Sequence, residues 1–120
     1  MKRYSAEHQW VEQDGNEAVV GISVYAQESL GDLCYVELPK IGAAFKAGEA
    51  FCVVESTKAA SDVFMPVGGT IVAVNGDLET NLAAINEDPE GAGWICRIRI
   101  DDPAEFDKLM DAAAYADMVK

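Results

Sequence analysis

A single lysine stands in an acidic part of the chain. Lys58 lies in the segment 55–62, which reads ESTKAASD, and it is the only basic residue between Lys46 and Arg97. Every other charged residue in that window is an acid, so Lys58 does not belong to a spread cationic binding face. A primary amine presented alone in this way is suited to be found and modified by another enzyme.

The residues on either side of Lys58 predict a hairpin. Residues 51–54 (FCVV) are aromatic, thiol and β-branched, which favours a pleated strand. Residues 63–65 (VFM) form a second such run, and Pro66 ends it because proline cannot donate to a central ladder. We therefore expect a lysine hairpin around residues 51–65, with the amine presented to solvent at its tip.

The alternative is a helix through the same segment. In a helix, Lys58 would lie three and four residues from Glu55 and Asp62 and could pair with both. Exposed pairs of that kind contribute about 0.2–1 kcal/mol each and imply no function. The β-type residues before Glu55 favour the hairpin over this helix.

Size and charge limit the classes of function. The 120 residues suit one domain, residues 1–120, with a core large enough to fold without metal or disulfide. The net charge of −12 disfavours nucleic-acid binding and favours steered encounters with basic partner surfaces. No apolar segment is long enough for a membrane span, and residues 1–8 lack the apolar run of a secretory signal. We expect a cytoplasmic protein that binds no membrane.

The cysteines point to the same compartment. Cys34, Cys52 and Cys96 are odd in number, widely separated, and lie inside apolar runs. This pattern argues against a disulfide framework and against a zinc site. We interpret all three as small core residues in a reducing environment.

The order of elements predicts a β-rich domain that ends in helices. Strands are expected at 10–12, 18–23, 33–38 and 94–100, and a short helix at 25–30 with Gly31 as its C-cap. In the helical segment 103–119, Asp102 can cap, Pro103 fits the first position, and Glu105 completes a capping-box spacing.

No self-sufficient catalytic site is visible. The one histidine, His8, leaves no His-based metal cluster and is interpreted as a structural or loop residue. An acidic domain that displays one lysine instead suggests a group carrier, in which a covalent cofactor holds the reactive chemistry. Ala59, Ala60 and Ser61 leave room around such an arm.

Several motifs along the chain resemble the H protein of the glycine cleavage system, a lipoyl carrier. The most specific is Glu-Ser-x-Lys-Ala-x-Ser-Asp at 55–62; biotin carriers and 2-oxoacid dehydrogenase lipoyl domains have different residues at the modified lysine. The other matching stretches are 8–11, 20–27, 30–32, 35–39, 47–51, 86–89 and 91–94, so the resemblance covers nearly the whole chain.

The resemblance implies a lipoyl group in amide linkage to Lys58 and a mainly β fold, the barrel-sandwich hybrid of lipoyl and biotinyl carriers. It implies a carrier component rather than an enzyme, with no catalytic residues and no metal. The carrier would take an aminomethyl group from a pyridoxal-phosphate glycine decarboxylase to a tetrahydrofolate-dependent aminomethyltransferase. Dihydrolipoamide dehydrogenase and a lipoate-attaching enzyme complete the expected partners, and docking with several of them suggests a monomer.

The same resemblance defines the environment of the arm. We assign recognition or arm contacts to Glu55, Ser56, Ala59, Ser61, Asp62, Glu7 and Gln9. The family usually has Glu where this chain has Gln9, whose neutral amide oxygen binds an ammonium less strongly. Glu7 lies close in sequence and could compensate. Glu90, at a position where the family often has Tyr, is interpreted as a tolerated change.

Two other functions stay open at this point. A divergent H-like protein could relay lipoyl groups or serve redox chemistry, and Gln9 is the residue that favours this alternative. An unmodified interaction domain, with Lys58 an ordinary surface residue, is the other.

Overall fold

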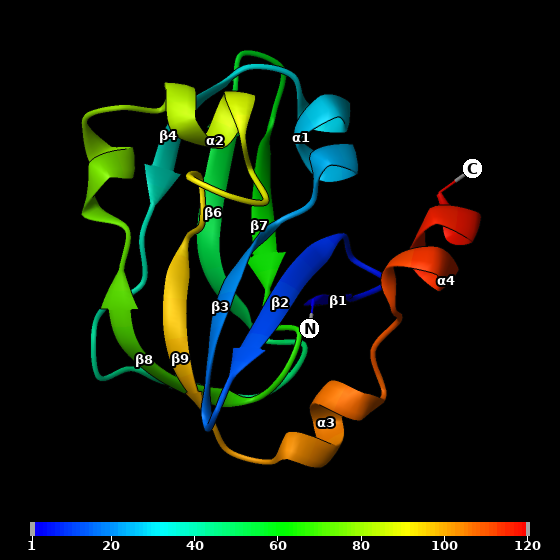
Figure 1. The fold of residues 1–120 in the computed structure, drawn as a ribbon. Coiled ribbons are helices and arrows are strands. Elements are labelled where there is room, and N and C mark those ends of the chain that lie inside the picture. The colour runs from blue at the N-terminus through cyan, green and yellow to red at the C-terminus, as the bar shows by residue number, and fades with distance from the viewer. Residues whose placement is uncertain (1, 120) are drawn as a thin grey trace.

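Two antiparallel sheets make up most of the molecule, which was obtained as a computed structural model that describes residues 2–119 (Figure 1). The larger sheet has the strand order β1-β2-β3-β9-β8-β5, and the smaller sheet has the order β4-β6-β7. The strands are β1 (Lys2–Tyr4), β2 (Gln9–Asp14), β3 (Glu17–Ile22), β4 (Leu33–Glu37), β5 (Ala44–Phe45), β6 (Ala50–Ser56), β7 (Ala60–Phe64), β8 (Gly69–Val74) and β9 (Cys96–Ile100).

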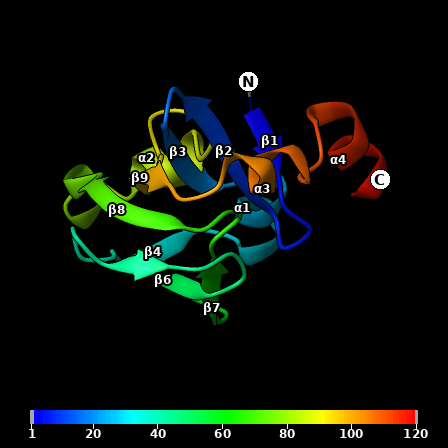
Figure 2. The same ribbon diagram turned by 90° about the horizontal axis from the view of Figure 1, so that it is seen from below.

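The two sheets form separate layers whose apolar faces meet. Figure 2, a view along the molecule from below, shows β4, β6 and β7 in one layer and the other labelled strands in the second. Fully buried side chains from both layers fill the space between them, including Val20, Val54, Val63, Ile71 and Ile98. This architecture confirms the expected mainly β, barrel-sandwich hybrid fold with short helices and a helical C-terminus.

The helices are short and lie outside the sheets. They are α1 (Val24–Leu30), the 3₁₀ helix η1 (Gly76–Glu79), α2 (Ala83–Glu87), α3 (Pro103–Asp107) and α4 (Ala112–Met118). The expected end of α1 is confirmed: Gly31 has φ 83° and its amide donates to the Gln27 carbonyl. A positive φ costs glycine little, because it has no Cβ.

The start of α3 is only partly as predicted. Asp102 caps the helix by accepting from the Ala104 amide, and Pro103 occupies the first turn. The capping box is wrong, because the Glu105 side chain accepts instead from the Gly68 amide at 2.9 Å. Glu105 therefore ties α3 to the loop before β8 rather than closing its own helix.

Cys34 also departs from its expected place. Cys52 and Cys96 are buried, as predicted, but Cys34 is exposed. The pairing of β4 with β6 shifts register between Leu33 and Tyr35, so the strict alternation of inward and outward side chains is broken there. Both Cys34 and Tyr35 consequently face solvent. No described helix has the length and apolar character that crossing a bilayer requires.

Candidate functional site

Lys58 lies at the tip of the β6–β7 hairpin. The last residue pair of the two strands is Glu55 with Ala60, and the Ser56 amide donates to the Ala59 carbonyl at 2.8 Å. Thr57 and Lys58 are thus the two central residues of a tight turn, and Lys58 is exposed. The helix alternative is wrong: the segment forms strand, turn and strand.

The Ser56 hydroxyl holds this turn together. Its oxygen accepts from the Lys58 amide at 3.2 Å and from the Ala59 amide at 3.3 Å, and it lies 3.3 Å from the Ala59 carbonyl, to which it can donate. Two-residue hairpin turns usually need a positive φ at a central position, yet His8 is the only non-glycine residue among 2–119 with one. The serine hydroxyl thus stabilises a turn without glycine, which explains a serine two residues before the lysine.

The Lys58 side chain extends across the end of α1. A Cβ built on Gly31 would lie 3.9 Å from both Cε and Nζ of Lys58, so the missing side chain of Gly31 leaves room there. Among residues 2–119, Lys58 forms no ion pair with an acid. Figure 1 shows the hairpin tip next to the end of α1. The amine therefore lies beside the end of α1 and is exposed to solvent.

The two acids of the motif share one face of the hairpin. Val53 pairs with Asp62 and Glu55 pairs with Ala60, so Glu55 and Asp62 are diagonal neighbours on the same side. Asp62 is exposed and Glu55 half-buried. Register therefore brings both carboxylates to the outer surface near the lysine, a few residues back from the tip.

The small residues of the motif leave the surface after the lysine open. Ala59 and Ala60 are exposed, and Ser61 is half-buried with its hydroxyl 3.4 Å from the Asp62 carbonyl. None of these side chains extends over Lys58 as a larger residue could. The turn is therefore open to solvent.

Gln9 does not occupy the place that we expected for it. Its side chain is 3 % exposed; its oxygen accepts from the Ser5 hydroxyl at 2.7 Å, and its nitrogen donates to the Glu7 carbonyl at 2.8 Å. Both polar atoms are thus engaged beneath the surface, because Gln9 begins β2 and points inward. Glu7, in contrast, is exposed. In this conformation Gln9 contributes no open amide oxygen to a groove, and Glu7 is the available acid of this pair.

His8 lies between the two ends of the chain. It has φ 73°, its Nδ1 lies 2.8 Å from the Tyr115 hydroxyl, and its ring packs 4.6 Å from that of Tyr25. Tyr115 belongs to α4, so this contact joins the N-terminal part of the chain to its C-terminal helix.

Glu90 is more than a tolerated change. Its carboxylate accepts from the Val24 amide at 2.9 Å and from the Tyr4 hydroxyl at 2.6 Å. It also lies 3.7 Å from the Lys2 amine. The partners are 66 to 88 positions away, so no local pattern could have indicated them.

Asn86 holds the exit from α1. Its side-chain oxygen accepts from the Leu33 amide at 2.7 Å, and its nitrogen donates to the Leu33 carbonyl at 3.1 Å. This residue was part of a matching stretch, but its role became visible only from its contacts.

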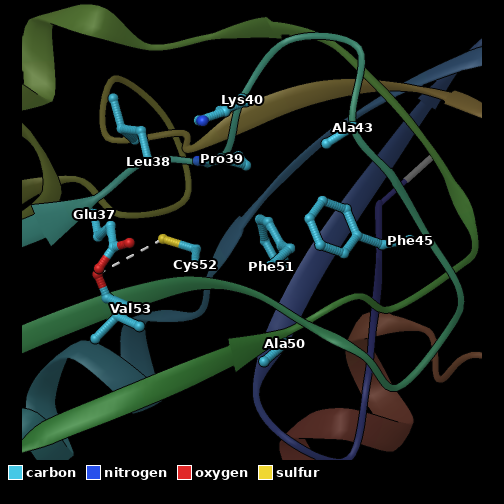
Figure 3. Close-up of a pocket in the computed structure, with 10 residues that line it drawn as sticks. All are labelled: Glu37, Leu38, Pro39, Lys40, Ala43, Phe45, Ala50, Phe51, Cys52 and Val53. Atoms are coloured by element: carbon cyan, nitrogen blue, oxygen red, sulfur yellow. Dashed lines mark hydrogen bonds between the residues drawn. The ribbon is translucent and has the colours of Figure 1, made fainter.

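One open pocket lies away from the lysine. It has a volume of about 350 Å³ and is lined by Phe45, Phe51 and Cys52, among others, at the end of the hairpin opposite Lys58 (Figure 3). Burial raises the pKa of the Cys52 thiol to about 12, so this sulfur is a packed apolar group at neutral pH. Within residues 2–119, no group of three or more His, Cys, Asp or Glu side chains is arranged to hold a metal ion.

Comparison with known proteins agrees with this geometry. The family model described as glycine cleavage H-protein matches residues 2–120. The chain belongs to the glycine cleavage H-protein family. It is 49 % identical to the glycine cleavage system H protein of Parvibaculum lavamentivorans, over 98 % of this chain and 94 % of that relative. It is 48 % identical to the Myxococcus xanthus H protein, over 98 % and 92 %.

A solved H-protein structure has the same fold. The glycine cleavage system H protein of Mycobacterium marinum superposes with a TM-score of 0.89 at 37 % identity, covering 98 % of this chain and 95 % of that one. The H-protein match spans both sheets, the lysine hairpin and the helical C-terminus. The likeness therefore extends to the whole arrangement that positions Lys58.

Proposed function

We propose that Lys58 carries a lipoyl group in amide linkage and that the protein is the shuttle of the glycine cleavage system. When bound, that group supplies a disulfide/dithiol couple on a long flexible arm, which carries an aminomethyl group from glycine decarboxylase to the aminomethyltransferase. The protein is then a carrier component with no catalytic residue of its own. The observation that carries the proposal is an exposed amine, without an ion pair among residues 2–119, at a tight hairpin tip in a chain of this family.

The residues around Lys58 fit an amide-linked arm. Acylation removes the charge of the amine, and since Lys58 forms no ion pair within residues 2–119, no salt bridge is lost. The Ser56 hydroxyl keeps the turn in one shape for the attaching enzyme, and Gly31 leaves space for the lysine stem. Glu55 and Asp62 mark one face of the hairpin for recognition, while Ala59 and Ser61 keep its surface open.

The charge of the molecule suits its proposed partners. A net charge of −12 steers the carrier toward basic surfaces and speeds encounter, as a shuttle between several enzymes requires. These partners are glycine decarboxylase, the aminomethyltransferase, dihydrolipoamide dehydrogenase and a lipoate-attaching enzyme. We further propose that the protein acts as a monomer in the cytoplasm, where its thiols stay reduced.

The test is lipoylation followed by exchange. After expression with lipoate and a lipoate ligase, intact mass and peptide mapping should show one lipoyl increment, on Lys58. With glycine decarboxylase, the lipoylated protein should support exchange between glycine and bicarbonate. Lys58→Arg should abolish both, because the guanidinium keeps the charge but is not acylated by the same chemistry.

A matched control separates the arm from general charge effects. Lys46→Arg makes the same change at another exposed lysine and should leave modification and exchange intact. Both variants should unfold within about 0.5 kcal/mol of the parent, since exposed substitutions are usually mild. Exchange that persists in Lys58→Arg would refute the assignment of the arm.

Lipoyl relay and redox use were favoured by Gln9 alone. Because the Gln9 side chain is buried and engaged with Ser5 and Glu7, it no longer distinguishes these roles from glycine cleavage. A lipoylated protein that gives no glycine exchange would nevertheless point to them.

A further inference from the structure

Helix α1, which ends beside the lysine, gains little stability from burial of its side chains. None of the seven residues of α1 is buried, and Val24 and Tyr25 are 46 % and 40 % exposed. Ala26 and Leu30 pack against the core only in part. A helix this short is not stable alone in water. Its position must therefore depend strongly on contacts at its ends.

The N-terminal end of α1 is held by two side-chain acceptors. The first amides of a helix have no partner within the helix. The Ser23 hydroxyl accepts from the Ala26 amide at 3.1 Å, and the Glu90 carboxylate accepts from the Val24 amide at 2.9 Å. A carboxylate is favourable there because the helix dipole is positive at this end.

Both acceptors are fixed in turn by a pair of stacked tyrosines. Ser23, with no exposed surface, lies 2.7 Å from the Tyr115 hydroxyl, and Glu90 lies 2.6 Å from the Tyr4 hydroxyl. The rings of Tyr4 and Tyr115 are stacked with centroids 4.5 Å apart and planes 9° apart. Burial first, and then the hydrogen bond to Glu90, raises the pKa of Tyr4 well above 10.0, so its phenol stays protonated and donates.

These contacts form one structure, which we name the α1 lock: Tyr4, Ser23, Glu90 and Tyr115. It joins β1, the start of α1, the loop before β9 and the C-terminal helix α4. The other end of α1 is Gly31, and the end of the Lys58 side chain lies beside it. The lock thus acts on the same short helix that ends beside the lysine.

We propose that Glu90 and Tyr115 are positioning residues for the Lys58 arm. They fix α1 at its N-terminus, so that Gly31 keeps its place beside the stem of the lysine. The C-terminal helix acts on the lysine site in this way, through Tyr115 and α1. The functional part of this inference rests on the proposed lipoyl shuttle, whereas its structural part applies to the unmodified protein.

Two conservative variants test the lock. Tyr115→Phe removes the hydroxyl and keeps the ring that stacks on Tyr4. Glu90→Gln keeps the size and one acceptor oxygen but removes the charge. Matched controls are Tyr35→Phe and Glu79→Gln, which make the same changes at exposed residues outside the lock.

The first measurement uses unmodified protein. Amide hydrogen exchange across 24–31 should speed up about fivefold in each lock variant, the effect of losing roughly 1 kcal/mol of hydrogen bonding. Exchange in β6, β8 and β9 should change less than twofold. The nuclear Overhauser contact between Gly31 Hα and Lys58 Hε should weaken, and the controls should behave as the parent.

The second measurement uses lipoylated protein as the substrate of glycine decarboxylase. The lock variants should raise KM severalfold and leave kcat within twofold, because the arm is less well placed before docking while the chemistry belongs to the partner enzyme. A smaller folded fraction of the carrier would also raise the apparent KM with kcat unchanged. The carrier concentration is therefore taken as the folded fraction measured by circular dichroism, and the increase in KM should persist after that correction.

Three results would overturn the inference. These are unchanged exchange across 24–31, acceleration spread evenly over both sheets, or local loosening with an unchanged Gly31–Lys58 contact and KM. If the parent protein is not lipoylated at Lys58, the shuttle proposal fails, and the exchange and Gly31–Lys58 contact data still decide whether the lock places α1 against the lysine.

Discussion

The substitution Ser56→Ala should loosen the turn that presents Lys58. Ser56 is 9 % exposed, and its hydroxyl makes the three turn contacts of 3.2–3.3 Å described above. These distances are long for hydrogen bonds, so each contributes toward the lower limit of the usual net range, about 0.5 kcal/mol. Together they amount to about 1–2 kcal/mol of the free energy of unfolding.

That loss of stability corresponds to a decrease in the melting temperature. With an unfolding entropy of roughly 2.1 cal/mol/K per residue, 1–2 kcal/mol corresponds to a decrease in Tm of about 4–8 °C for a chain of this length. The turn itself should remain, because the bond from the Ser56 amide to the Ala59 carbonyl, at 2.8 Å, does not involve the side chain. The rate of lipoylation by the attaching enzyme should fall, since Lys58 is then presented in more than one conformation.

The assay is differential scanning calorimetry alongside a lipoylation time course. Ser61→Ala is the matched control, because its hydroxyl has only a 3.4 Å contact with the neighbouring Asp62 carbonyl. It should lower Tm by less than 2 °C, for a loss below about 0.5 kcal/mol. Ser56→Thr keeps the hydroxyl and should restore most of the stability. Equal effects of the two alanine variants, or parent-like lipoylation of Ser56→Ala, would refute the role given to Ser56.

Two further perturbations test the surroundings of the site. Cys34 is the exposed thiol, whereas burial raises the pKa of Cys52 to about 12 and that of Cys96 higher still. A disulfide reagent at pH 8 should therefore label one thiol in the native protein and three after denaturation. Fast labelling of more than one thiol in the native protein would contradict the burial of Cys52 and Cys96. Because these folded-state pKa values lie above the ordinary 9.0, the stability that the buried thiols contribute is complete below pH 9 and is lost as pH rises toward 12. Gly31→Ala should lower the free energy of unfolding by about 1 kcal/mol, because φ is 83° there. It should leave the stem of Lys58 in place, because the new Cβ would lie 3.9 Å from its Cε, an ordinary van der Waals distance. Chemical denaturation and the chemical shifts of the Lys58 side chain check the two expectations, and an unchanged stability would contradict the cost assigned to the positive φ.

Local features of the chain could be predicted from the sequence. The β-type run 51–54 and the ending at Pro66 predicted the hairpin, and Gly31 predicted the end of α1. The alternation of apolar and charged residues in 94–100 predicts that Arg97 and Arg99 lie on the face away from the core. In β9, Arg97 is half-buried and Arg99 exposed, whereas Cys96, Ile98 and Ile100 are buried. Such predictions succeed because propensity, alternation and capping depend on neighbours within a few residues.

Features that depend on strand register or on distant partners could not be predicted from the sequence. The shift between β4 and β6 turned Cys34 outward, and Gln9 proved to be engaged beneath the surface. Glu105 found its partner in Gly68 rather than in its own helix. In each case the outcome depends on which backbone group or side chain faces the residue after the sheets have packed.

The lysine site shows both kinds of information together. A motif of eight residues identifies Lys58, and the local turn presents it. Where α1 lies beside that lysine depends on Glu90 and Tyr115, which meet the start of the helix from 66 and 92 positions away. A hydrogen bond between such distant residues exists only once the chain is folded, because closing loops of that length costs entropy that the packed sheets must offset.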